Sequence, residues 1–95
     1  GLPDTVLHLL QNYFSSHPEI TKVVIYGSRA LGREQPGSDV DLAIFTTVEK
    51  DISASVALDL DELKTPYTFD VLDYKSITHG PLKEHIDRVG INLLR

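Results

Sequence analysis

Hydrophobic and polar residues alternate with two different periods along this chain. The first period is helical: apolar side chains recur every three or four positions between residues 4 and 15, which predicts a helix with one buried face. The members of this stripe are Val6, Leu7, Leu10, Tyr13 and Phe14. The polar segment 15–18 ends in proline and closes the helix.

The second period is that of a β-strand. Residues 20–26 are dense in β-branched side chains and predict a buried strand. In residues 39–46 polar and apolar side chains alternate. Successive side chains of a strand point to opposite faces of the sheet. The residues expected to face the core are Val40, Leu42 and Ile44, and those expected on the other face are Asp39, Asp41 and Ala43.

The second half of the chain predicts a helix, a strand and another helix. The first of these helices carries the apolar stripe Ile52, Val56, Leu60 and Leu63, and residues 67–74 predict the third strand. Pro81 suits the start of the last helix, Gly90 its end, and residues 91–94 a short closing strand. This order predicts one α+β domain, residues 1–95, in which a small mixed β-sheet carries helices packed on one face.

Composition narrows the class of protein. The chain has 95 residues, a hydrophobic fraction of 41% and a net charge of −5, values typical of a small globular domain. The negative charge argues against direct binding of nucleic acid, which uses basic surfaces. Cysteine is absent, and no apolar segment is long enough to span a bilayer. No membrane partner is therefore expected, and a cytoplasmic location is the default expectation.

The candidate chemistry begins where the first predicted strand ends. Gly27 allows a tight turn and a close approach to the backbone, and Ser28 can cap a short helical turn at residues 29–31. Backbone N–H groups at such a corner favour a phosphate. Arg29 either reaches a triphosphate oxygen or is a solvated residue of the turn. Taken alone, a Gly-Ser pair is more often an ordinary turn.

Three aspartates supply the second part of the pattern. Asp39 and Asp41 share one strand face, where two carboxylates repel each other unless a cation lies between them. Oxygen ligands favour Mg²⁺ or Mn²⁺. Asp70 stands inside the apolar run of the third strand, and it can point to the same place if that strand lies beside theirs. Asp73, on the opposite face, is expected to cap the following turn.

The histidines show no such pattern. None of the four has the spacing of a metal site, and each is expected at the surface or at the edge of the core. They are His8, His17, His79 and His85.

The spacing Gly-Ser, ten residues, Asp-x-Asp resembles the signature of the nucleotidyltransferases of the DNA polymerase β superfamily. The short chain is similar to the minimal nucleotidyltransferases of the MNT type, antitoxins that pair with HEPN-domain proteins. This resemblance implies a polymerase-β-like fold, ATP as the nucleotide donor, and contacts to it from Gly27, Ser28 and Arg29. It also implies two Mg²⁺ ions held by Asp39, Asp41 and Asp70, with Mn²⁺ as an alternative metal.

The same resemblance implies that AMP is transferred to a tyrosine of a HEPN-domain toxin, which silences that toxin. Two other functions remain open from the sequence. One is an antitoxin that acts by binding alone, and the other is one half of a two-chain enzyme that modifies a small molecule. In either case a partner or a further subunit would supply the acceptor surface, so a homo- or hetero-oligomer is compatible with the sequence.

Overall fold

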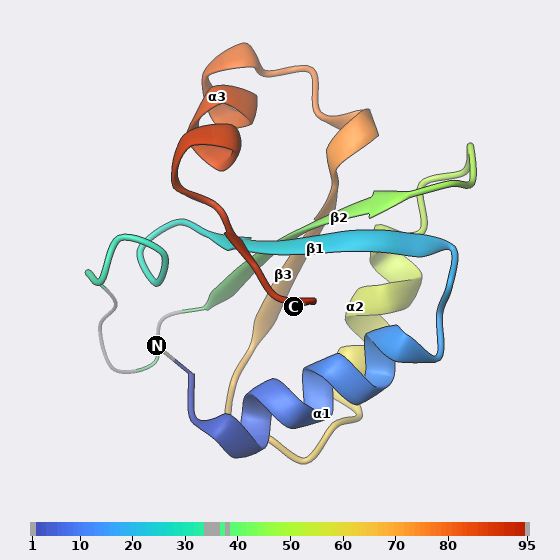
Figure 1. Ribbon diagram of the computed structural model, residues 1–95, viewed down its shortest axis with the longest axis vertical. Coiled ribbons are helices and arrows are strands. Elements are labelled where there is room, and N and C mark those ends of the chain that lie inside the picture. Colours follow the sequence, from blue (N-terminus) through green and yellow to red (C-terminus); the bar gives the residue numbers. More distant parts are fainter. Residues whose placement is uncertain (1, 34–36, 38, 95) are drawn as a thin grey trace.

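A computed structural model describes residues 2–33, 37 and 39–94, and its elements follow the predicted order (Figure 1). Within these residues no helix is both long enough and apolar enough to cross a membrane. The elements are α1 (Asp4–Ser15), β1 (Ile20–Tyr26), β2 (Val40–Thr46), α2 (Ser53–Asp61), β3 (Phe69–Asp73), the 3₁₀ turn η1 (Tyr74–Ser76), α3 (Gly80–Val89) and β4 (Ile91–Asn92). The predicted α+β class is confirmed.

The four strands form one mixed sheet in the order β3-β2-β1-β4. β1 pairs antiparallel with both β2 and β4, whereas β2 and β3 are parallel. Parallel neighbours need a crossover connection, and α2 supplies it. Because β2 and β3 run in the same direction, the first residues of both strands lie at the same end of the sheet.

One face of the sheet packs against α1 and α2. The buried side chains of the two helices and of the strands form one hydrophobic cluster on this face. The helices contribute Val6, Leu10 and Phe14 from α1 and Val56 and Leu60 from α2. As predicted, Val40, Leu42 and Ile44 of β2 belong to it, and all three are fully buried. The alternation of apolar residues in β2 therefore identified the core face correctly.

The prediction that all helices pack on one face is wrong, because α3 covers the opposite face (Figure 1). Ile86 of α3 packs there with Val24, Tyr26 and Ala43. The physical reason lies in β1, where Val23 and Val24 are consecutive apolar residues on opposite faces. Both faces of this strand need cover.

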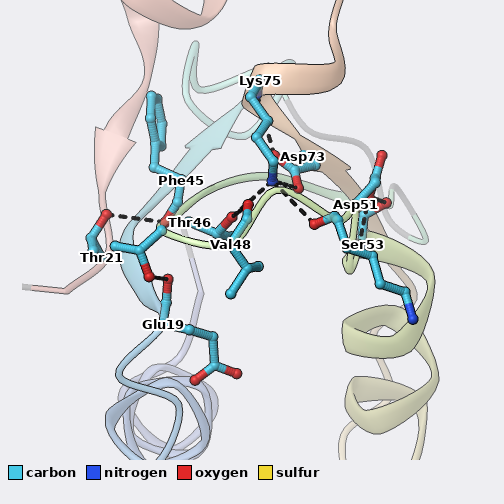
Figure 2. A network of polar contacts seen from close by, with 11 residues as sticks. Glu19, Thr21, Phe45, Thr46, Val48, Asp51, Ser53, Asp73 and Lys75 are labelled. Atoms are coloured by element: carbon cyan, nitrogen blue, oxygen red, sulfur yellow. Dashed lines mark hydrogen bonds and ion pairs between the residues drawn. The ribbon is translucent and has the colours of Figure 1, made fainter.

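A polar network lies where β2 and β3 end, at Thr46 and Asp73 (Figure 2). Asp73 is only 2% exposed, and its carboxylate accepts from Lys75 Nζ at 2.5 Å and from the Lys75 amide at 3.3 Å. Lys75 Nζ also donates to Thr46 Oγ1 at 2.8 Å and to the Lys50 carbonyl at 3.3 Å. The predicted capping role of Asp73 is confirmed, and the buried carboxylate has a cationic partner.

Candidate active site

The predicted corner follows the last residue of β1. Gly27 has φ +75°, in the left-handed region that glycine occupies without strain. The Leu31 amide donates to the Gly27 carbonyl at 3.3 Å, and the Arg33 amide donates to the Ser28 carbonyl at 2.8 Å. The chain therefore makes consecutive turns here. Ser28 and Arg29 are half-buried in these turns.

Gly27 lies directly against the carboxylate of Asp41. A Cβ atom added at Gly27 would be 2.2 Å from Asp41 Oδ2, which is far inside van der Waals contact. The sequence suggested that glycine leaves room for a ligand, and in this structure the carboxylate itself occupies that room. Any other residue at position 27 would have to displace Asp41.

Asp41 pairs in register with Asp70 across the parallel strands β2 and β3, and with Tyr26 across the antiparallel strands β1 and β2. Register partners share a sheet face, so Tyr26, Asp41 and Asp70 form one row across three strands. The prediction that Asp70 points where Asp41 points is supported by this register. Asp70 is exposed, however, and so it does not carry the cost of burial that the apolar run suggested.

In this row, burial and the repulsion between carboxylates outweigh the nearby positive charge. Burial, followed by the charges of Asp70 and Asp39, raises the pKa of Asp41, and the nearby charge of Arg29 lowers it only in part. Burial and the charges of Asp41 and Asp70 likewise raise the pKa of Tyr26. The two neighbouring aspartates thus make the ionised form of Asp41 less favourable, a repulsion that a divalent cation would relieve.

Asp39 lies exposed just before β2. Across residues 2–33, 37 and 39–94, no group of three histidine, aspartate or glutamate side chains has the mutual arrangement of a metal site. The oxygen donors and their mutual repulsion fit Mg²⁺ or Mn²⁺, but the ligand set Asp39, Asp41 and Asp70 stays a prediction.

Arg29 lies near Asp41 of this row. Its guanidinium Cζ is 4.9 Å from the centroid of the Tyr67 ring, and its charge acts to lower the pKa of Asp41. This packing is inconsistent with a fully solvated turn residue, and the predicted contact of Arg29 with a triphosphate oxygen stays a prediction. Tyr67 was not recognised from the sequence, because an aromatic residue at the start of a predicted strand gives no sign that it will stack on an arginine; the observed β3 begins two residues later, at Phe69.

His85 is a second residue of this region that the sequence did not reveal. The Gly27 amide donates to His85 Nε2 at 3.3 Å, and the imidazole meets the Tyr26 ring edge to face, with 6.2 Å between centroids. A signal was present: position 85 follows Leu82 by three and precedes Val89 by four, so it lies on the inward stripe of α3. Spacing among the histidines alone did not show this.

Residues 9–95 match the family profile described as "Polymerase beta, Nucleotidyltransferase", and the chain belongs to this family. No curated protein sequence matches the chain.

Several solved structures share this fold. A toxin–antitoxin complex described as MntA–HepT matches with a TM-score of 0.72 and 16% identity, over 96% of this chain and 71% of that one. A toxin–antitoxin structure with AMP-PNP matches with a TM-score of 0.66 and 20% identity, over 97% and 73%. A putative nucleotidyltransferase from Sulfolobus solfataricus matches with a TM-score of 0.52 and 21% identity, over 93% and 78%.

Proposed function

We propose that this chain transfers a nucleoside monophosphate, AMP from ATP, to a hydroxyl acceptor, and that the acceptor is a tyrosine of a HEPN-domain toxin. The activity would make the chain an antitoxin of the adenylyltransferase type. The observation that carries the proposal is the register pairing of Asp41 with Asp70, with the Gly27 corner seated against Asp41. Membership in the polymerase β nucleotidyltransferase family supports the reaction class.

Each residue of the corner has a role in this reaction. The backbone amides after Gly27 and the Ser28 hydroxyl would bind the outer phosphates, and Arg29 would add a positive charge beside them. Asp39, Asp41 and Asp70 would hold two Mg²⁺ ions, which when bound neutralise phosphate charge and lower the pKa of the acceptor hydroxyl.

The exposed position of Asp70 suits a further step. Its carboxylate would accept the proton of the acceptor hydroxyl as the new bond from oxygen to the α-phosphorus forms. The bond between the α-phosphorus and the bridging oxygen breaks at the same time, and pyrophosphate leaves with the electron pair. Positioning of the two reactants would supply most of the rate enhancement.

Two features support a protein as acceptor. The carboxylates of Asp39 and Asp70 are exposed, so a large partner can reach them. The net charge of −5 complements the basic surface that an RNA-cleaving toxin would need. The fold shared with the MntA–HepT structures is consistent with such a pairing.

The direct test measures pyrophosphate release from ATP and Mg²⁺ in the presence of a HEPN-domain toxin, together with the mass of the toxin. We expect Mg²⁺-dependent release and a mass increase equal to whole AMP units. The double variant Asp39→Asn, Asp41→Asn should lose both, and Asp61→Asn, which changes an exposed carboxylate at the end of α2, should retain both.

The outcome also separates the other two functions. An antitoxin that acts by binding alone would still neutralise the toxin after loss of Asp39 and Asp41. Turnover with a small hydroxylated acceptor, and none with the toxin, would instead indicate one half of a two-chain small-molecule enzyme. Full turnover by the double variant would rule out the proposed chemistry.

A further inference from the structure

His85 connects α3 to the corner that follows β1. Its Nε2 atom accepts a hydrogen bond of 3.3 Å from the amide of Gly27, a residue 58 positions earlier in the chain. Its ring also meets the Tyr26 ring at an interplanar angle of 80°. The imidazole therefore contacts two consecutive residues, one that ends β1 and one that begins the corner.

The helix that carries His85 is firmly placed. Ile86, the next residue, is 2% exposed and packs with Val24, Tyr26 and Ala43 of the sheet. After the helix, Gly90 lies so close to Val24 that an added Cβ would be 3.3 Å from the Val24 Cβ. Leu82, three residues before His85, packs against the same cluster. Because α3 is packed on the sheet before and after position 85, the imidazole is a stable anchor for the group it binds.

The group that His85 holds is the amide of a glycine, a residue with wide conformational freedom. Glycine occupies positive and negative φ about equally, so Gly27 alone does not keep the corner in one conformation. A hydrogen bond from its amide to a fixed acceptor selects the observed φ of +75°. This conformation keeps the backbone against the Asp41 carboxylate and sets the direction of the Ser28 and Arg29 amides.

We propose that His85 is a positioning residue for the nucleotide site: through the bond from the Gly27 amide to its Nε2, it holds the phosphate-binding corner in place against Asp41. This inference rests on the proposed function for its effect on nucleotide binding, but the hydrogen bond itself does not. An accepting Nε2 carries no proton, so the neutral ring has its proton on Nδ1.

The test compares two substitutions at position 85 in the full chain. In His85→Gln the side-chain carbonyl can accept from the Gly27 amide in place of Nε2, whereas His85→Phe keeps a ring beside Tyr26 but has no acceptor. His8→Phe is the control, because His8 is exposed on α1, on the other side of the sheet.

The first readout does not depend on catalysis. Hydrogen exchange of the Gly27 amide, followed by NMR on ¹⁵N-labelled protein, should be about tenfold faster in His85→Phe than in the unmodified chain, and nearly unchanged in His85→Gln and His8→Phe. The second readout is the KM for ATP in the pyrophosphate assay. It should rise about three- to tenfold in His85→Phe with kcat changed less than about twofold, and the glutamine variant should restore it.

Several results would overturn the inference. They are unchanged Gly27 exchange and KM in His85→Phe, a glutamine variant as impaired as the phenylalanine variant, and an Nε2 atom that carries the proton in the ¹⁵N spectrum of the unmodified chain. That spectrum decides the matter if His85→Phe does not fold. If the unmodified chain shows no turnover, the proposed function has failed, and the dissociation constant for a non-hydrolysable ATP analogue then replaces KM.

Discussion

Two aspartates of β3, Asp70 and Asp73, lie three residues apart and have opposite surroundings. Asp73 is 2% exposed, and Lys75 Nζ lies 2.5 Å from its carboxylate. Asp70 is exposed, and its neighbour across the strands is another carboxylate, Asp41. One end of the β2–β3 pair thus has its negative charge matched within the chain, while the other end gathers negative charge.

This difference separates a structural carboxylate, Asp73, from one for which we propose a catalytic role, Asp70. A buried carboxylate that holds the fold together is compensated by a cation and hydrogen bonds from its own chain, as Asp73 is. Asp41 has Arg29 and His85 nearby, yet burial and the two other aspartates still raise its pKa. A set of acids left with excess repulsion is suited to binding a cation from solution.

The largest expected effect is the loss of catalysis in Asp70→Asn. We expect kcat for nucleotidyl transfer to fall about 10²–10³-fold, because in the proposed reaction Asp70 is both a metal ligand and the proton acceptor. The free energy of unfolding should change by less than about 0.5 kcal/mol, since Asp70 is exposed. Pyrophosphate release and chemical denaturation measure the two quantities. A variant that loses stability and keeps turnover would show that Asp70 is a structural carboxylate and not a catalytic one.

Gly27→Ala tests the contact between the corner and Asp41. The added Cβ would collide with Asp41 Oδ2, so we expect turnover to fall about 10²-fold and stability to fall by about 1–2 kcal/mol. Gly32→Ala is the matched control, because Gly32 also has a positive φ, +70°, but nothing lies within 4 Å of its added Cβ. It should lose about 1 kcal/mol of stability and keep its turnover. Equal kinetic losses in both variants would show that backbone strain alone is responsible.

Lys75→Met tests the end of the β2–β3 pair where the Asp73 carboxylate is paired with Lys75. The substitution leaves Asp73 buried without its cation, and because the Lys75 side chain is 34% exposed we expect a loss of about 2 kcal/mol rather than the full value for a buried pair. A loss of this size lowers the melting temperature of a domain of this length by about 10 °C. Turnover measured well below the melting temperature should stay within about twofold. A fully stable variant would show that the network in Figure 2 contributes no stability.

The smallest expected effects are changes of folding stability with pH, and they have opposite signs at Asp41 and Asp51. The folded pKa of Asp41 is raised above 3.8, so the stability that comes from its protonation is present below that pH and is lost as the pH rises through the raised pKa. Asp41→Asn should therefore gain stability relative to the unmodified chain as the pH rises towards neutral. Addition of Mg²⁺ should reduce this gain if Asp41 holds the ion.

Asp51 provides the opposite case. Hydrogen bonds from the Ser53 hydroxyl and amide lower the pKa of Asp51 below 3.8, so its contribution to stability is present above that value and is lost as the pH falls through the lowered pKa. Asp51→Asn should be slightly less stable than the unmodified chain at neutral pH and equal to it in acid. Melting temperatures between about pH 3 and pH 7 test both aspartates.

Much of the fold could be predicted from hydrophobic spacing. α1 and β1 begin and end where the pattern placed them, and β2 was predicted one residue longer than it is. The packing of α3 on the second face was missed because consecutive apolar residues such as Val23 and Val24 show that both faces are buried without showing what covers each face.

The candidate site was predictable where residues are close in sequence, as at Gly27–Ser28 and at Asp39 and Asp41. The register of Asp70 against Asp41 depends on the pairing of two strands, which the sequence offered only as a condition. His85 and Tyr67 were missed because their importance arises from contacts with residues 58 and 38 positions away in the chain. Such contacts leave little local signal beyond a place on a helical stripe.

The parallel pairing of β2 and β3 also fixes how this chain can change in length. Thr46 lies five residues after Asp41, and Lys75 lies five residues after Asp70, so the Lys75–Thr46 bond repeats the acid register at the opposite end of both strands. Additional residues in the crossover between the strands can loop out and leave both ends aligned. A single residue inserted between Asp70 and Asp73 cannot, because it would turn one of the two carboxylates to the wrong side of the sheet. The crossover of this chain can therefore change in length without moving either end of the strand pair, while the spacing of three residues cannot change.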